Sequence, residues 1–280
     1  MYPSGKQKSL LRSIITKLGR ENPAYALFLQ KKIKMRTGLV GAMREEILLL
    51  KDEIQDLKTD QVGSREFLSG TLEGKEVILC LSGWGKVAAA STATSLINLY
   101  QVDQLLFIGL AGSMQAHLEV GDIVVADKLI QHDVDLTMLH DFPDVKPPFW
   151  KTFEFEVYPV AWQRALNAVQ QFVVNLNEGQ YPSIHEGYKP NVHVGSIATG
   201  DQFIASPEGK NRICLRFPEA LCTEMEGAAI AQVAADYGIP CSVIRIISDK
   251  ADEQAHQSFT RFLFENISHI SVEIARLMFI

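Results

Sequence analysis

The stretch that decides the fold is residues 82–112, SGWGKVAAASTATSLINLYQVDQLLFIGLAG. Its glycine turn at residues 82–86 opens an alanine-rich segment, which predicts a helix over Val87–Tyr100. After the polar residues 101–104, the apolar run Leu105–Leu110 has the length of a buried strand and ends at Ala111-Gly112. A turn, a helix and a buried strand in this order are typical of a sheet whose strands are joined through helices.

The same alternation continues on both sides of this stretch, without an internal repeat. The predicted strands are Gly38–Ala42, Phe67–Leu72 and Glu76–Leu81 (a hairpin), Ile123–Val125, Val192–Ala198 and Ser242–Ile247. The predicted helices are Glu45–Asp56, Val160–Val174, Gly227–Tyr237 and Phe259–Phe279. We interpret Asn175–Asn191 as a long surface loop. The pattern predicts one α/β domain with a mixed, mostly parallel central sheet flanked by helices.

Composition excludes several classes of protein. The 280 residues are 47% hydrophobic and 21% charged, which excludes a disordered, collagen-like or disulfide-scaffold chain. No apolar run approaches the length of a membrane span. The four cysteines show neither CxxC spacing nor a Cys/His cluster, so we expect no metal site, no cofactor, and reduced thiols in a cytoplasmic protein.

The net charge of −6 is divided unevenly along the chain. Residues 1–36 contain nine Lys/Arg and one acid, a net +8, so the remainder carries −14. An acidic body is a poor nucleic-acid binder. We interpret 1–36 as a basic N-terminal extension, with a short amphipathic helix at Ser9–Leu18, and 37–280 as the α/β domain. A targeting signal and a membrane-surface helix are the alternatives to a solvated extension.

Acids and glycines follow the strands in four segments: 41–46 (GAMREE), 196–204 (SIATGDQFI), 223–229 (TEMEGAA) and 245–249 (RIISD). Taken singly, each has a structural explanation, since acids favour the first turn of a helix and a Ser-Asp pair can cap one. In open α/β sheets, however, ligands bind outside the carboxyl ends of the strands. These segments therefore hold the candidate site residues.

Taken together and in order, the motifs GAM-x-EE, SG-x-GK, GDI-x-V, TGD-x-F-I, EMEGAA and R-x-ISD resemble the nucleoside phosphorylase/hydrolase superfamily. More closely, they are similar to the 5′-methylthioadenosine/S-adenosylhomocysteine nucleosidases, over residues 35 to about 263. The resemblance implies a nucleoside phosphorylase-like fold. It also implies hydrolysis of the N-glycosidic bond of a 5′-modified adenosine (5′-methylthioadenosine, S-adenosylhomocysteine or 5′-deoxyadenosine), giving adenine and the free pentose.

The resemblance also implies catalytic roles. Asp249 matches the general acid that protonates the departing purine, a task for which burial must raise its pKa. Glu46 matches the carboxylate that orients and deprotonates the attacking water, and Arg245 matches a residue beside them.

The remaining matched positions would contact the small-molecule adenine nucleoside. Glu226 would bind the ribose hydroxyls, and such hydrogen bonds strengthen as the sugar becomes oxocarbenium-like. Phe203 would stack on adenine, and Met225 would pack under the ribose. The other expected binding positions are Glu224, Ile204, Ser248, Met43 and Phe259.

The sequence departs from the family at two positions. Leu110 stands where bacterial enzymes have a serine, so a hydroxyl near the sugar and the water is absent. Trp84 replaces a small aliphatic residue, and we expect its indole, with Leu136 and Leu139 nearby, to reshape the 5′ pocket. The preferred 5′ substituent stays open.

Two alternative functions stay open. A phosphate-dependent phosphorylase usually has an arginine before the glycine turn of the third strand, whereas residues 105–109 are apolar here. A non-catalytic nucleoside-binding protein would not need Glu46, Glu226 and Asp249 together. The resemblance further implies a homodimer, with candidate interface positions at His132, Asp133 and 136–144.

Overall fold

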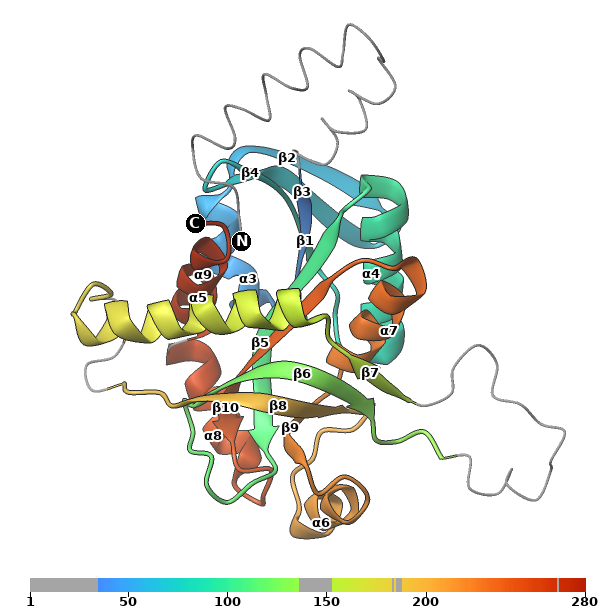
Figure 1. Cartoon of the computed structure of the whole chain (residues 1–280), viewed down its shortest axis with the longest axis vertical. Helices are drawn as coiled ribbons and strands as arrows, with labels where there is room; N and C mark the ends of the chain where they lie inside the picture. The colour runs from blue at the N-terminus through green and yellow to red at the C-terminus, as the bar shows by residue number, and fades with distance from the viewer. Residues whose placement is uncertain (1–34, 136–152, 183, 185–187, 266) are drawn as a thin grey trace, which may run out of the picture.

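A computed structural model describes residues 35–135, 153–182, 184, 188–265 and 267–280. Residues 1–34, Leu136, Leu139 and the stretch 136–144 therefore lie outside the described residues. Figure 1 shows an α/β fold in which helices cover both faces of a strongly twisted sheet.

The strands form one mixed sheet, as predicted. Its order is β10 (Cys241–Asp249), β6 (Ile123–Gln131), β8 (Val192–Thr199), β9 (Ala220–Glu224), β5 (Gln104–Ser113), β1 (Arg36–Gly41), β4 (Lys75–Leu81), β3 (Arg65–Leu72) and β2 (Gln55–Val62), with β7 (Glu154–Glu156) on β6. Strands β4, β1, β5 and β10 are parallel neighbours, whereas β2, β3 and β4 pair antiparallel. Because β10 pairs with β5 as well as β6, strands β5, β10, β6, β8 and β9 close into a ring.

The helices lie in two groups on the sheet (Figure 1). One face is covered by α4 (Lys86–Tyr100) and α7 (Gly227–Tyr237), which pack on each other. The other face is covered by α3 (Arg44–Glu53), α5 (Pro159–Asn177) and α9 (Ile267–Leu277). Helices α6 (Pro207–Arg216) and α8 (Ala255–Glu265) lie near the ring of strands.

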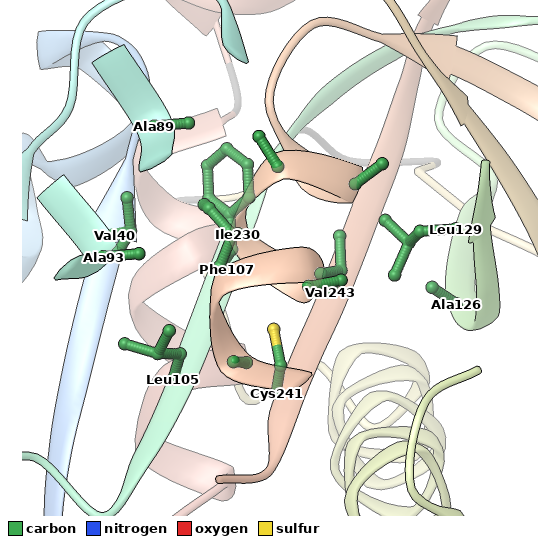
Figure 2. Close-up of a cluster of buried hydrophobic side chains, with 14 of the residues drawn as sticks. Val40, Ala89, Ala93, Leu105, Phe107, Ala126, Leu129, Ile230, Cys241 and Val243 are labelled. Atoms are coloured by element: carbon green, nitrogen blue, oxygen red, sulfur yellow. The ribbon is translucent and has the colours of Figure 1, made fainter. Parts of the chain in front are cut away.

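Apolar side chains fill the space between the sheet and each helix group. Figure 2 shows the cluster beneath α4 and α7, where Ala89 and Ala93 of α4 and Ile230 of α7 face Phe107 and Val243 of the sheet. Small residues on α4 and α7 let these helices approach the sheet closely, which explains the alanine-rich composition of both. A second cluster fills the opposite face.

Several predicted boundaries are wrong. Helix α3 ends at Glu53, three residues before the predicted Asp56, because the chain turns into β2 at Gln55. Within the predicted helix Phe259–Phe279, the structure describes α8 up to Glu265 and α9 from Ile267 to Leu277, and Asn266 lies outside the described residues. The loop predicted from Asn175 begins later, since α5 runs to Asn177. Strands β2, β7 and β9 and helix α6 were not predicted from the sequence.

The ends of the strands set the position of the candidate site. Since β1, β4, β5 and β10 are parallel, the residues that follow them emerge at one edge of the sheet.

All four cysteines are free thiols. Among the described residues, no group of His, Cys, Asp and Glu could hold a metal ion, and no helix could span a membrane.

Candidate active site

Glu46 is held at the end of β1 by backbone N–H groups. It lies in the first turn of α3, and its Oε2 accepts hydrogen bonds from the N–H groups of Ala42 (2.6 Å) and Met43 (3.0 Å). Its Oε1 accepts a third, from the N–H of Leu110 on β5 (3.2 Å). Burial raises the pKa of Glu46, and the Arg245 guanidinium and these N–H groups only partly offset it. A fixed carboxylate with a raised pKa suits a general base.

Arg245 is a buried cation in the middle of β10. Its side chain is 1% exposed, and its guanidinium lies over the Phe107 ring, 3.8 Å from the centroid. It donates a hydrogen bond to Oε2 of Glu224, and it lies 3.8 Å from Oε2 of Glu226. Burial of the guanidinium lowers its pKa, but the surrounding carboxylates outweigh this and raise it overall. The arginine therefore stays charged among acids that need a counter-ion.

Glu224 binds groups of the protein rather than facing outward. Its carboxylate accepts hydrogen bonds from the Thr199 hydroxyl, from Arg245, and from the N–H groups of Glu226 (2.9 Å) and Gly227 (2.8 Å). It thus fixes the first turn of α7 to the end of β8 and to β10. The structure places Glu224 as a support for Glu226 and Arg245.

Glu226 reaches from the start of α7 to the glycine turn before α4. Its Oε1 accepts a hydrogen bond from the N–H of Gly85 (2.7 Å), whose φ of +88° favours glycine. Burial, together with the nearby negative charge of Glu224, raises the pKa of Glu226 to about 8.

Asp249 lies at the end of β10. Its Oδ2 accepts a hydrogen bond from the Ser248 hydroxyl (2.8 Å), and its Oδ1 accepts one from the N–H of Ala251 (2.8 Å). A Cβ added to Gly112 of β5 would lie 2.8 Å from Oδ1, so a glycine there makes room for this carboxyl. Burial raises the pKa of Asp249 despite both hydrogen bonds. A carboxyl group with a raised pKa can serve as a general acid.

The structure brings together some of the predicted binding residues. Phe203 and Phe259 meet edge to face, with ring centroids 5.6 Å apart, and Phe203 is 48% exposed. Ile204 is buried, and Met43 and Met225 are half-buried. Trp84 is 73% exposed, in the turn before Gly85.

Three groups at the site were not singled out from the sequence. They are the Thr199 hydroxyl, the Gly85 N–H and the Phe107 ring. Thr199 and Gly85 lie inside the TGD and SG-x-GK motifs, so their motif positions were a usable signal. Phe107 lies in an apolar strand, where nothing distinguishes a partner of arginine from a core residue.

Known proteins resemble this chain along most of its length. The family model of the phosphorylase superfamily matches residues 36–277. The 5′-methylthioadenosine/S-adenosylhomocysteine nucleosidase of Bacillus subtilis (strain 168) is 35% identical over 235 residues, which are 84% of this chain and 94% of that protein.

Solved structures give the same result. The 5′-methylthioadenosine/S-adenosylhomocysteine nucleosidase of Neisseria meningitidis, in complex with methylthio-immucillin-A, is 32% identical with a TM-score of 0.76; the match covers 87% of this chain and 98% of that one. The futalosine hydrolase of Helicobacter pylori is 34% identical with a TM-score of 0.73, and the match covers 88% and 98%. The chain therefore belongs to the phosphorylase superfamily and, within it, to the family of the 5′-methylthioadenosine/S-adenosylhomocysteine nucleosidases.

Proposed function

We propose that this protein is an N-glycosidase that hydrolyses a 5′-modified adenosine to adenine and the free pentose. One observation carries the proposal: β5 places a glycine beside each of two separate acidic groups. Gly109 adjoins Glu46 and Arg245, and Gly112 adjoins Asp249. Three residues along a strand span about 10 Å, so the two acidic groups are held at separate points along β5.

The roles of the groups follow from the charges that develop in the reaction. The bond between C1′ and the purine nitrogen breaks with its electron pair on the base, and Asp249 donates a proton to the purine ring so that it leaves neutral. The water oxygen bonds to C1′ and gives a proton to Glu46. Glu226 accepts hydrogen bonds from the ribose hydroxyls, which strengthen as positive charge builds on the sugar.

The charge around Arg245 favours water over phosphate as the nucleophile. Glu46, Glu224 and Glu226 surround its guanidinium. Even with a proton on Glu226, the Glu224 carboxylate balances the guanidinium, so the cluster offers phosphate no surplus positive charge. This supports hydrolysis rather than phosphorolysis.

The site also supports contacts with the base and the sugar. Phe203, with Phe259 against its edge, offers an aromatic face for adenine. We assign Met225 to the underside of the ribose, Met43 and Trp84 to the 5′ pocket, and Ile204 and Ser248 to the edge of the base.

We also propose that the protein acts as a cytoplasmic homodimer. Exposed apolar side chains beside the site support it: Trp84 (73% exposed), Val87 (82%) and Phe203 (48%). Of the predicted interface positions, His132 is buried and Asp133 binds Lys86 within the chain, so the apolar residues are the better candidates. Sedimentation equilibrium tests the dimer, and a monomer at micromolar concentration would contradict it.

The function is tested with a panel of nucleosides. The purified protein is incubated with 5′-methylthioadenosine, S-adenosylhomocysteine, 5′-deoxyadenosine and futalosine, with and without phosphate, in H₂¹⁸O. We expect free base and a pentose carrying ¹⁸O at C1, formed equally well without phosphate. The Glu46→Gln variant is the matched control for contaminating hydrolases. A product that appears only with phosphate, as a sugar 1-phosphate, would contradict the proposal.

A further inference from the structure

A lysine on α6 joins the two strand ends that enclose Asp249. The Nζ of Lys210 donates hydrogen bonds to the backbone oxygen of Ser113, at the end of β5 (2.7 Å), and to that of Lys250, directly after β10 (2.8 Å). Ser113 follows Gly112, the glycine that makes room for the Asp249 carboxyl. One ammonium group therefore bridges the residues next to Asp249 on both strands.

The N-cap of helix α6 and its packing on neighbouring loops hold Lys210 in the position from which it makes these hydrogen bonds. Ser206 caps its first turn by accepting a hydrogen bond from the N–H of Gly209 (3.2 Å). Ile213 of α6 packs in a small apolar cluster with Met114, after β5, and Ala251, after β10. The helix thus rests on the two loops that Lys210 joins, and the half-buried lysine has little freedom to point elsewhere.

We propose that Lys210 is a positioning residue for Asp249, which clamps the ends of β5 and β10 and sets the charge beside the proton donor. This inference rests on the proposed role of Asp249 as the general acid.

Several charged and titratable groups lie around Asp249, and they change its pKa in opposite directions. Its ammonium lowers the pKa of Asp249, while Asp252, in the following turn, raises it. The Cys222 thiol of β9 also faces Asp249, and burial raises the pKa of that thiol. The ammonium of Lys250 is turned away, toward Glu119 (2.7 Å). Lys210 is therefore a cation that opposes the effect of burial on the pKa of Asp249.

The test compares Lys210→Met, which removes the charge and both hydrogen bonds, with Lys210→Arg, which keeps a cationic donor. Lys128→Met is the matched control, since Lys128 pairs with Glu154 and Glu219 on the surface. The pKa of Asp249 is measured by ¹³C NMR titration of labelled aspartate, with its signal assigned by its absence in Asp249→Asn. The turnover number is measured on the same samples.

In Lys210→Met we expect the pKa of Asp249 to rise, because a positive charge that stabilises the carboxylate is gone. We expect the turnover number to fall by about tenfold, since a small misplacement of a reacting group is costly. Lys210→Arg is expected to restore both values, and Lys128→Met to change neither.

An unchanged pKa of Asp249 in folded Lys210→Met would overturn the inference, even if turnover fell, because a merely structural lysine would give that result. A failure of the proposed function gives a different pattern. In that case Asp249→Asn keeps its turnover, while the titration of Lys210→Met still reports whether Lys210 acts on the carboxyl.

Discussion

The carboxylate of Glu46 and the guanidinium of Arg245 share the space directly over Gly109. A Cβ built on Gly109 would overlap Nη1 of Arg245 and lie 2.6 Å from Oε1 of Glu46. Glu46 follows β1 and Arg245 lies on β10, the two parallel neighbours of β5, and their side chains meet because β5 carries no side chain at this point. A glycine in a buried strand thus makes room for both of these side chains.

Gly109→Ala should therefore damage the site more than the fold. The added methyl group cannot coexist with Glu46 and Arg245 in their present positions, and displacing them should lower kcat by about 10²-fold or more. The control is Gly209→Ala in α6, where a Cβ would make ordinary contacts at 3.4 Å. Steady-state kinetics on both variants checks this, and an active Gly109→Ala enzyme would contradict the arrangement.

Glu226→Gln should change how stability depends on pH. The pKa of Glu226 is raised from 4.5 to about 8, so between these values the folded protein keeps a proton that the unfolded chain releases. The Glu226 carboxyl therefore makes the wild-type protein less stable as pH rises from about 5 to 8, by at most about 1.4 kcal/mol per pH unit. Glutamine cannot titrate. As pH rises across this range, the free energy of unfolding of the variant therefore increases relative to that of the wild type.

Urea unfolding at several pH values measures this difference. The exposed Glu66→Gln controls for the loss of a carboxyl group. Parallel stability curves for Glu226→Gln and wild type would show that Glu226 does not hold a proton in the folded state. The same variant should also weaken both substrate binding and turnover, because we assign to Glu226 hydrogen bonds with the ribose in the ground state and in the transition state.

Trp84→Ile should relax the preference for compact 5′ substituents. Trp84 directly precedes Gly85, whose N–H binds Glu226, and we assign its ring to the sugar side of the site. A change of side-chain bulk in an apolar pocket alters substrate discrimination by about 1–3 kcal/mol, a shift of roughly ten- to two-hundredfold. The measurement is the ratio of kcat/KM for 5′-methylthioadenosine and S-adenosylhomocysteine, with exposed Leu99→Ala of α4 as the control. An unchanged ratio would show that Trp84 does not line the 5′ pocket.

A chain that begins at Met35 should fold and keep its activity. β1 starts at Arg36, whose N–H donates to Asp103 (2.8 Å) and whose side chain pairs with Glu76 (3.1 Å). Every proposed site residue lies downstream of these contacts. Thermal unfolding and the nucleoside assay check this, and loss of either folding or activity would show that residues 1–34 are needed.

The fold was predictable where the sequence combines periodicity with clear ends. Helix α7 spans the predicted Gly227–Tyr237, because Gly238 takes the left-handed conformation that ends it (φ +66°). Strand β2 was not predictable, because its residues 55–61 are exposed and, apart from Leu57, polar, so no alternation marks it.

The candidate site was predictable in its acids and in Arg245. Glu46, Glu226 and Asp249 follow strands in motifs that the family resemblance identifies, and the structure buries all three. The contacts of Thr199 and Phe107 could not be predicted, because they depend on how the strands pack. Thr199 binds Glu224 and Phe107 lies under Arg245, and each partner is on another strand. Lys210 is a polar residue on a helix, and nothing in its sequence surroundings distinguishes it from a solvated one.

The donation of a proton from Asp249 to the leaving base is tested most directly by Asp249→Asn in single-turnover kinetics. Asparagine keeps the size of the side chain and can still hydrogen-bond the base, but it has no acidic proton to give. We expect the rate of base release to fall by about 10²–10⁴, while adenine still binds. Glu46→Gln, in which the water loses its base, should also turn over slowly with substrate affinity largely kept. A folded Asp249→Asn enzyme that releases base at close to the wild-type rate would contradict the role of Asp249 as the general acid.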